Sequence, residues 1–357
     1  MVKLLFSGYA PVHFVCFRPL YERLRQVRGL DVWFSGGKKV GRNGTLRYDA
    51  AALYRPFDIP RDHVLPVDVM RRRTFDLAFS AHTSGFFPNR PCPKVQIFHG
   101  VSFRNAAVRE DQRKYDALFA VGPYMMRVLK RRRIAPRRAV PVGFPKLDPL
   151  RNGSLRRDEI LDSLGLRGDR PVILYAPTGQ KNNSLETMGE EVIERIRASG
   201  RFELLIKPHD HPRNPINWFR RLHRFEGPHV KLVRGLDVVP FLYAADLLIS
   251  DASSVASEFT LLDRPIVFLD VPKLIAHARR KEGALDLKTY GRKTGITVRR
   301  PQDAVPTIGW FLDHPRHRSS TRRRMAKDLF YNPGRATDVA VDWLMRRLRR
   351  EFPWLGA

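Results

Sequence analysis

Residues 245–270 decide the predicted fold, and they read A-D-L-L-I-S-D-A-S-S-V-A-S-E-F-T-L-L-D-R-P-I-V-F-L-D. The apolar run 247–249 is typical of a strand that is buried on both faces of a parallel sheet. Residues 255–262 place apolar side chains at helical spacing, and the Asp-Arg-Pro of 263–265 ends that helix because proline disfavours the α conformation in the residue before it. Residues 266–269 form a second apolar run. The stretch is therefore predicted to fold as strand, helix and parallel strand.

Polar side chains separate the first of these strands from the helix. Ser250, Asp251, Ser253 and Ser254 lie in this turn, and Glu258 follows within the helix. In open α/β sheets, ligands bind beyond the carboxyl ends of the strands, where a helix N-terminus offers unpaired N–H groups and about half a positive charge to an anion. The turn is therefore a candidate phosphate site. A purely structural interpretation is also open, in which Ser253 or Ser254 only caps the helix.

The rest of the chain repeats this alternation of strands and helices. We predict further strands at 3–7, 31–35, 77–79, 94–98, 117–121, 139–142, 172–175, 202–206 and 229–233. Such alternation favours doubly wound parallel sheets, and the polar segment 150–169 suits the start of a second domain. The predicted fold is α/β, with two Rossmann-like domains at 1–149 and 150–335 that face each other across a cleft, which is the GT-B arrangement.

Residues 336–357 are predicted to form a basic amphipathic helix. Its apolar face contains Val339, Trp343, Leu344, Leu348 and Phe352, and arginines 346, 347, 349 and 350 occupy the rest of its surface. Two interpretations are open for this helix. It lies on an anionic membrane, or it packs back across the first domain.

Charge is the unusual feature of the composition. The 357 residues include 65 Lys and Arg against 36 Asp and Glu, which gives a formal net charge of +29. Basic runs lie at 130–133, 137–138, 322–324 and 346–350. They predict an anionic partner, which is nucleic acid, an anionic membrane leaflet or a phosphate-rich polymer. A solvated basic surface without such a partner is the simpler alternative.

The sequence also limits where the protein acts and what it binds. No apolar run approaches the ~20 residues of a spanning helix, and the N-terminus does not resemble a signal peptide, so we expect a cytoplasmic protein. Cys16 and Cys92 lack the spacing of metal ligands, and no metal site is predicted.

Further polar residues follow predicted strands, where ligands of parallel sheets bind. His99 comes directly after the strand 94–98, and an imidazole there suits a general base for a hydroxyl, although a lone histidine is more often structural. Thr178 follows the strand 172–175. Lys207 and His209 follow the strand 202–206, and cations at this position suit a pyrophosphate.

Six short segments together resemble the CDP-glycerol glycerophosphotransferase family, which includes the poly(glycerol phosphate) primases and polymerases of teichoic acid synthesis. They are I-F-H-G at 97–100, G-F-P-K-L-D at 143–148, L-Y-A-P-T at 174–178, I-K-P-H at 206–209, I-S-D-A-S-S at 249–254 and D-R-P at 263–265. The resemblance implies a GT-B enzyme that moves glycerol phosphate, or a similar polyol phosphate, from a CDP-linked donor to a hydroxyl of a surface polymer or lipid-linked acceptor and releases CMP. It implies no required cofactor or protein-bound metal.

The resemblance also implies roles for individual residues. His99 would be the catalytic base. The donor pocket and its phosphate ligands would include Thr178, Lys207, His209, Asp251, Ser253, Ser254 and Glu258. A lipid-linked acceptor implies a peripheral position at the cytoplasmic face of an anionic membrane.

Three departures from the family pattern leave the donor open. They are residues 101–104, Gly179-Gln180 and Ala252. The first alternative is therefore a GT-B glycosyltransferase of capsule or surface polysaccharide synthesis that uses another nucleotide-activated sugar. The alternative of another class is a basic nucleic-acid-binding protein, which is disfavoured because the basic runs lack interleaved aromatic residues for base stacking.

Overall fold

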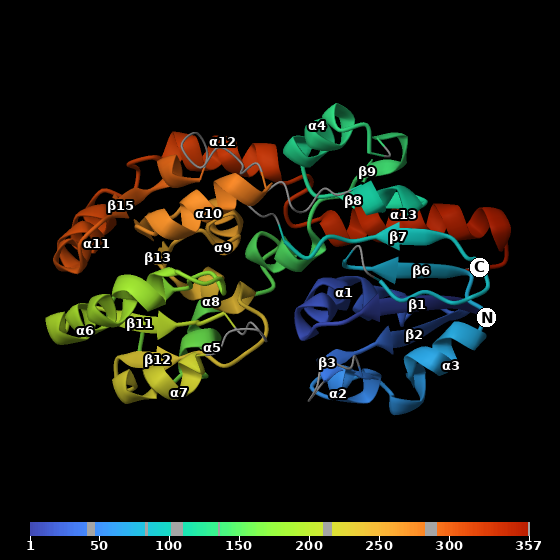
Figure 1. The fold of residues 1–357 in the computed structure, drawn as a ribbon, viewed down its shortest axis with the longest axis horizontal. Coiled ribbons are helices and arrows are strands. Elements are labelled where there is room, and N and C mark those ends of the chain that lie inside the picture. Colours follow the sequence, from blue (N-terminus) through green and yellow to red (C-terminus); the bar gives the residue numbers. More distant parts are fainter. Residues whose placement is uncertain are drawn as a thin grey trace. The chain divides into compact units, whose positions relative to one another are not determined.

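The computed structural model describes residues 1–40, 47–82, 85–100, 110–134, 136–209, 216–282 and 291–355, so residues 101–104 lie outside it. The chain divides into two compact units (Figure 1). Unit 1 comprises Met1–Gly100, Val108–Asp148 and Phe330–Ala357, and unit 2 comprises Val101–Ala107 and Pro149–Leu329. The predicted boundaries lay after residues 149 and 335, whereas the units divide after Asp148 and Leu329.

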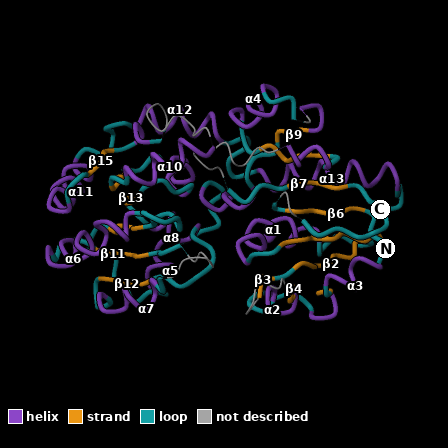
Figure 2. The backbone as a smooth tube through the Cα atoms, in the orientation of Figure 1, coloured by secondary structure: helices purple, strands orange, loops and turns teal. Residues whose placement is uncertain are grey.

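Unit 1 contains a parallel sheet with the strand order β5-β2-β1-β6-β7-β8-β9. Its strands are β1 (Val2–Gly8), β2 (Leu30–Gly36), β5 (Val64–Leu65), β6 (Leu77–Ser80), β7 (Lys94–Gln96), β8 (Ala117–Ala120) and β9 (Ala139–Pro141), and a separate antiparallel ribbon contains β3 (Lys38–Val40) and β4 (Arg47–Asp49). Its helices are α1 (Pro11–Leu24), α2 (Ala50–Tyr54), α3 (Val67–Arg72), α4 (Pro123–Arg131) and α13 (Ala336–Glu351), with shorter turns at Arg61–His63, Glu110–Lys114, Pro136–Arg138 and Pro145–Leu150 (Figure 2).

Apolar side chains on both faces of β1 explain why this strand lies inside the sheet. Leu4 and Phe6 pack into one core, and Leu5, on the opposite face, packs into another. The rings of Phe6 and Phe79 stack with their centroids 4.7 Å apart, which ties β1 to β6. Because successive side chains of a strand point to opposite faces, both faces of this sheet are covered.

Helix α13 packs on unit 1, as the second interpretation of the C-terminal helix predicts. Leu344 and Leu348 are buried in the same core as Phe6. The carboxylate of Asp148 accepts hydrogen bonds from the backbone N–H groups of Ala336 (3.0 Å) and Thr337 (2.7 Å), at the start of α13. This carboxylate satisfies two N–H groups that a helix start leaves unpaired, and it complements the helix dipole.

Unit 2 contains a second parallel sheet, with the strand order β12-β11-β10-β13-β14-β15. Its strands are β10 (Val172–Tyr175), β11 (Glu203–Ile206), β12 (Val230–Leu232), β13 (Leu247–Ser250), β14 (Ile266–Leu269) and β15 (Ile296–Val298). Its helices are α5 (Arg157–Asp162), the π-helix η6 (Leu185–Gly189), α6 (Glu190–Ser199), α7 (Trp218–Leu222), α8 (Val239–Ala244), α9 (Val255–Phe259), α10 (Pro272–Glu282), α11 (Ala304–Asp313) and α12 (Ser319–Leu329), with shorter turns at His223–Phe225, Thr260–Leu262, Arg292–Thr294 and Pro301–Asp303.

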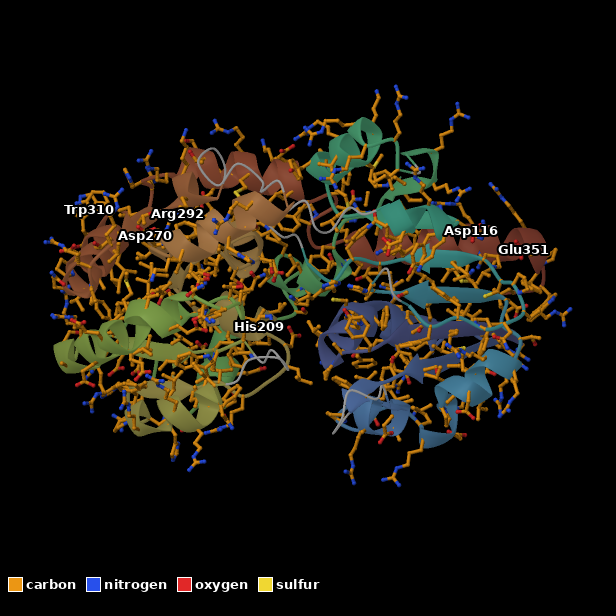
Figure 3. The ribbon with its side chains drawn as sticks, viewed as in Figure 1. Asp116, His209, Asp270, Arg292, Trp310 and Glu351 are labelled. Atoms are coloured by element: carbon orange, nitrogen blue, oxygen red, sulfur yellow. The ribbon has the colours of Figure 1, made fainter. Side chains whose placement is uncertain are left out.

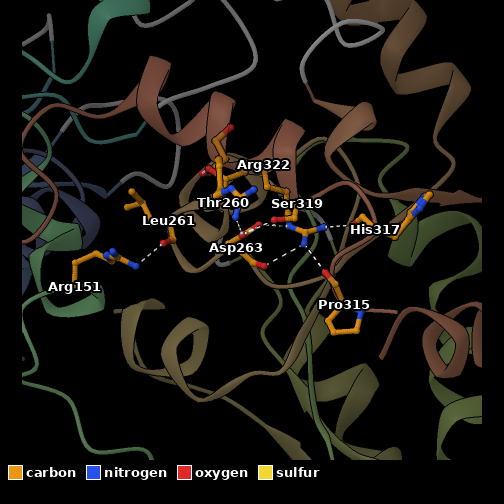
Figure 4. Close-up of polar contacts among 10 residues, drawn as sticks. Arg151, Thr260, Leu261, Asp263, Pro315, His317, Ser319 and Arg322 are labelled. Carbon is orange, nitrogen blue, oxygen red and sulfur yellow. Dashed lines mark hydrogen bonds and ion pairs between the residues drawn. The ribbon is translucent and has the colours of Figure 1, made fainter. Parts of the chain in front are cut away.

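The predicted strand, helix and parallel strand at 245–270 are confirmed as β13, α9 and β14. The helix is shorter than predicted, because its last turn at Thr260–Leu262 is a 3-10 helix that ends at Asp263 with φ of +54°. Arg322, which has no exposed surface, fixes this turn by binding both the carboxylate and the carbonyl of Asp263 (Figure 4). The α/β fold class is therefore confirmed in both units.

Across the described ranges, no helix combines the length and the apolar composition that a membrane span requires.

Candidate active site

His99 lies at the carboxyl edge of the sheet of unit 1. It follows β7, its side chain is exposed, and its Nδ1 lies 2.7 Å from the carbonyl oxygen of Ala81. A carbonyl oxygen can only accept a hydrogen bond, so Nδ1 carries a proton and Nε2 of the neutral ring carries the lone pair. This is the tautomer that a general base requires when it acts through Nε2.

Two further histidines lie beside His99, and the sequence did not identify them. The ring centroid of His13 lies 5.2 Å from that of His99, and the centroid of His82 lies 5.6 Å from it. The rings of His13 and His82 are nearly parallel at 6.0 Å. We call His13, His82 and His99 the histidine cluster.

The order of the strands explains why these three side chains meet. His13 follows β1, His82 follows β6 and His99 follows β7, and these strands are neighbours in the sheet (Figure 1). The carboxyl ends of neighbouring parallel strands meet at one edge. A sequence signal did exist, because each histidine follows a predicted strand, but their convergence depends on a strand order that is not the chain order.

His13 is the buried member of the histidine cluster. Its side chain is 2% exposed, and its Nδ1 accepts a hydrogen bond of 3.2 Å from the backbone N–H of Tyr9. Burial, together with the charges of His99 and His82, holds the pKa of His13 well below its usual value. His13 is therefore neutral near pH 7, with its proton on Nε2.

The other predicted residues lie at the carboxyl edge of the sheet of unit 2. Thr178 follows β10, Lys207 and His209 follow β11, and the turn that contains Asp251, Ser253 and Ser254 follows β13. These three strands are neighbours in the order β11-β10-β13. The structure therefore brings these side chains to one edge of one sheet, whereas His99 belongs to unit 1.

Asp251 organises this edge through its carboxylate. Its Oδ1 accepts hydrogen bonds from the backbone N–H groups of Thr178 (2.8 Å) and Ala252 (2.6 Å), and its Oδ2 accepts from both the N–H (2.9 Å) and the hydroxyl (2.8 Å) of Ser184. Asp251 is 2% exposed. A carboxylate held in this way braces the loop between Thr178 and Ser184 against β13.

The same loop is held at its far end. The backbone N–H of Asn182 donates to Glu186 (2.7 Å), and the side-chain amide of Asn183 donates to the carbonyl of Gln180 (2.8 Å). The π-helix η6 begins directly after Ser184. Single π turns occur frequently at functional sites, and this one ends a loop at the carboxyl edge of the sheet.

The two serines differ at the start of α9. Ser254 occupies the N-cap position without a side-chain capping bond, whereas the hydroxyl of Ser253 accepts a long hydrogen bond of 3.5 Å from the N–H of Val255. The capping interpretation of the serine-rich turn therefore rests on this one long bond to Ser253. Glu258 lies in α9 and is 1% exposed.

In the parts of the chain that the structure describes, no group of three or more His, Cys, Asp or Glu side chains has an arrangement that could hold a metal ion.

Comparison with known proteins identifies the family. Residues 94–290 match the family described as CDP-Glycerol:Poly(glycerophosphate) glycerophosphotransferase, and this range is more than half of the 357 residues. The chain belongs to this family. The range matched to the glycerophosphotransferase family includes His99 and every predicted donor-site residue, but it excludes His13 and His82.

This member of the glycerophosphotransferase family is similar to curated relatives over only part of their length. The teichoic acid glycerol-phosphate primase of Bacillus subtilis (strain 168) is 28% identical over 187 residues, which are 51% of this chain and 43% of that protein. The protein of the same name from Bacillus spizizenii (strain ATCC 23059 / NRRL B-14472 / W23) is 26% identical over 168 residues, which are 46% of this chain and 38% of that protein. Each match spans less than half of the relative's length.

Solved structures share the fold over nearly the whole chain. The wall teichoic acid polymerase TagF has a TM-score of 0.71 at 16% identity, covering 98% of this chain and 90% of that chain. The S. aureus MnaA–UDP co-structure has a TM-score of 0.62 at 13% identity, covering 98% of this chain and 97% of that chain. The predicted GT-B fold class is therefore confirmed for this member of the glycerophosphotransferase family.

Proposed function

We propose that this chain transfers glycerol phosphate, or a similar polyol phosphate, from a CDP-linked donor to a hydroxyl of an acceptor polymer or lipid-linked acceptor and releases CMP. Membership of the glycerophosphotransferase family supports the reaction class. The observation that carries the proposal is the edge of β11, β10 and β13, where Lys207, His209 and the hydroxyls of Ser253 and Ser254 follow neighbouring strands. Cations and hydroxyl donors at the carboxyl ends of parallel strands suit a pyrophosphate.

In the proposed reaction, His99 acts as the base. The acceptor hydroxyl oxygen attacks the phosphorus that bears the glycerol, and its proton passes to Nε2 of His99. The bond from that phosphorus to the bridging oxygen breaks, and CMP leaves with the electron pair of that bond. The hydrogen bond from Nδ1 to Ala81 supports this role, because it keeps the lone pair on Nε2.

Unit 2 would supply charge stabilisation. As the bridging oxygen departs, negative charge grows on the CMP phosphate, and Lys207 with His209 would offset it. Asp251 would act indirectly in this scheme, by holding the loop that carries Thr178. We therefore assign Asp251 a positioning role and Lys207, His209, Ser253 and Ser254 the role of ligands to the donor phosphates.

Incubation with activated donors tests the proposal. CDP-glycerol, CDP-ribitol and UDP-sugars are supplied separately with a glycerol phosphate oligomer, and nucleotide release is measured. We expect CMP from a CDP-polyol donor. UDP release from UDP-sugars alone would instead support the capsule-type glycosyltransferase. If no donor releases nucleotide and the chain binds RNA tightly and in a salt-sensitive way, the nucleic-acid alternative would be supported.

The surface charge supports a peripheral membrane position as part of this proposal. Helix α4 and the turns after it carry the exposed residues Arg127, Lys130, Arg131, Arg132, Arg133, Arg137 and Arg138. Nitrogen-tipped side chains project from α4 in Figure 3. Each Lys or Arg near an anionic leaflet contributes about 1 kcal/mol, so this group would bring the chain to a membrane that holds a lipid-linked acceptor.

The C-terminal helix would contribute charge but little apolar insertion. Leu344 and Leu348 are buried in unit 1, and Trp343 and Phe352 pack against the same core. Trp354 is exposed to 53% and remains available to a surface. We therefore propose that electrostatic attraction, rather than insertion of α13, holds the chain at the cytoplasmic face of the membrane.

A further inference from the structure

The turn after β6 contains the carbonyl group that orients His99. Nδ1 of His99 donates to the carbonyl oxygen of Ala81 over 2.7 Å, and Ala81 is 1% exposed. In the proposed reaction this bond keeps the proton of the neutral ring on Nδ1 and the lone pair on Nε2. The tautomer of His99 therefore depends on whether the carbonyl of Ala81 keeps its direction.

The hydroxyl of Ser80 holds the peptide group to which this carbonyl belongs. The carbonyl of Ala81 and the N–H of His82 lie in one planar peptide group, so a bond to the N–H also fixes the direction of the carbonyl. The hydroxyl of Ser80 accepts from this N–H (3.2 Å) and donates to the carbonyl oxygen of His82 (2.6 Å). Ser80 is 1% exposed, and its own carbonyl accepts from the N–H of Ile97 after β7 (2.8 Å). One side chain therefore ties the turn at two points.

Tyr115 ties the same turn to a distant part of the sheet. Its hydroxyl donates to the carbonyl oxygen of His82 (2.8 Å), which also accepts from the N–H of Gly85 (3.2 Å). Tyr115 precedes β8, and β7, which His99 follows, lies between β6 and β8 in the sheet. The ring has no exposed surface, and burial raises the pKa of the phenol above its usual value. The hydroxyl therefore remains a donor across the physiological pH range.

We propose that Tyr115 is a positioning residue for the base: together with Ser80, it holds the peptide group between Ala81 and His82 in the direction that keeps the proton of His99 on Nδ1. This inference rests on the proposed function, because it concerns the step that His99 performs. Both hydroxyls act on His99 through the backbone, so they affect proton transfer and not the binding of the donor.

Tyr115→Phe tests the proposal because it removes only the hydroxyl. The carbonyl of His82 keeps its bonds from Ser80 and Gly85, so we expect the variant to fold. With CDP-glycerol as donor and a glycerol phosphate oligomer as acceptor, we expect kcat to fall about 3- to 10-fold, which corresponds to one neutral hydrogen bond, while the donor KM is unchanged. A wild-type kcat would overturn the inference.

Tyr54→Phe is the matched control for the loss of a buried hydroxyl. Tyr54 is a phenol of unit 1 that is 2% exposed, and its hydroxyl also donates to a backbone carbonyl, that of Ser35, over 2.9 Å. We expect this variant to lose a similar amount of stability and to keep the wild-type kcat. If both variants lower kcat equally, the effect of Tyr115 is one of general stability and the inference fails.

A double substitution shows whether Tyr115 acts through His99. In a His99→Ala background the direction of the Ala81 carbonyl no longer matters, so adding Tyr115→Phe should change the residual kcat by less than about twofold. The same 3- to 10-fold loss in both backgrounds would mean that the hydroxyl acts independently of His99, and it would reject the positioning role.

The tautomer of His99 provides a readout that needs no substrate. Nitrogen NMR at about pH 8, above the ordinary pKa of histidine, distinguishes the protonated ring nitrogen from the unprotonated one. We expect the proton on Nδ1 in the wild type and in Tyr54→Phe, and a mixture of both tautomers in Tyr115→Phe. Ser80→Ala should give the same mixture, and it keeps the inference testable if Tyr115→Phe does not fold. Wild-type resonances of His99 in both variants would refute the inference.

The kinetic and NMR measurements together separate this inference from the proposed function. A changed tautomer in Tyr115→Phe, in a chain that releases no CMP from CDP-glycerol, would keep the hold on His99 and reject the proposed function. CMP release that depends on His99, with unchanged kcat and tautomer in Tyr115→Phe, would keep the function and reject the positioning role.

Discussion

Arg322 binds Asp263 with its Nε 3.0 Å from Oδ1, and its side chain has no exposed surface. The remaining guanidinium nitrogens donate to the carbonyl oxygens of Asp263, His317 and Pro315 (Figure 4). Asp263 occupies the left-handed turn between α9 and β14, so this arginine fixes the end of the helix behind the serine-rich turn. The side chain of Arg322 is buried, whereas that of Asp263 is 30% exposed.

Replacing Arg322 is expected to destabilise unit 2 strongly. Arg322→Met removes the buried cation that pairs with Asp263 and leaves three carbonyl oxygens without this donor, and a broken buried pair costs about 3–5 kcal/mol. We expect a value near the lower limit because Asp263 is partly exposed. Urea unfolding gives the free energy of unfolding. The matched control is Arg323→Met, since Arg323 is exposed and lies 3.8 Å from the same carboxylate, and it should change that free energy by less than about 1 kcal/mol.

Asp251→Asn is expected to reduce both stability and donor affinity. An amide nitrogen in place of one carboxylate oxygen faces an N–H of the braced loop, which costs about 1–3 kcal/mol of unfolding free energy. Ser254→Ala is the comparison, because this hydroxyl makes no capping bond and its loss should change only donor affinity. Urea unfolding and calorimetric titration with CMP measure the two quantities. Wild-type stability in Asp251→Asn would contradict the bracing role.

His99→Ala is expected to lower kcat by about 10²- to 10⁴-fold, the usual contribution of a general base, while the dissociation constant of the donor barely changes. CMP release and donor binding are measured on the same preparation. His223→Ala is the control, since His223 is an exposed histidine of unit 2 that pairs with Glu226. A weakened donor affinity at constant kcat would make His99 a binding residue instead.

The stability of unit 1 is expected to fall as the pH drops below about 6.5, the ordinary pKa of histidine. The folded pKa of His13 is lowered by burial and by His99 and His82, so the unfolded chain takes up a proton at His13 before the folded chain does. One such proton makes the free energy of unfolding decrease by at most about 1.4 kcal/mol per pH unit on acidification. Urea unfolding from pH 7.5 to 5 measures the slope, and His13→Gln should flatten it. A slope unchanged in His13→Gln would assign the effect to other groups.

Membrane binding is expected to depend on charge. The chain should sediment with anionic vesicles and not with neutral ones, and 1 M salt should release it because the Debye length falls to about 3 Å. Changing Lys130, Arg131 and Arg133 to Gln should weaken binding about 100-fold or more, at about 1 kcal/mol for each charge. The same change at Arg346, Arg349 and Arg350 tests the contribution of α13 without removing the buried Leu344 and Leu348. Equal binding to neutral and anionic vesicles would contradict the electrostatic proposal.

Local patterns in the sequence were sufficient to predict most strands of the two sheets, but not the short edge strands β5 and β15. The apolar run 247–249 predicted β13, and Pro265 predicted the break before β14. These predictions succeed because burial on both faces and the restricted backbone before proline act over a few neighbouring residues. His99 was identifiable for the same reason, since it directly follows an apolar strand.

The tertiary structure alone decided which distant residues meet. The sequence contains His13, His82 and His99 as separate histidines, and the sheet order β1-β6-β7 makes them a cluster. Similarly, only the structure shows that the carboxylate of Asp251 accepts a hydrogen bond from Ser184, and that the carboxylate of Asp148 accepts one from the start of α13. The physical reason is that strand order and helix docking depend on burial between segments far apart in the chain, whereas the repeating pattern of one segment records only which of its faces is buried.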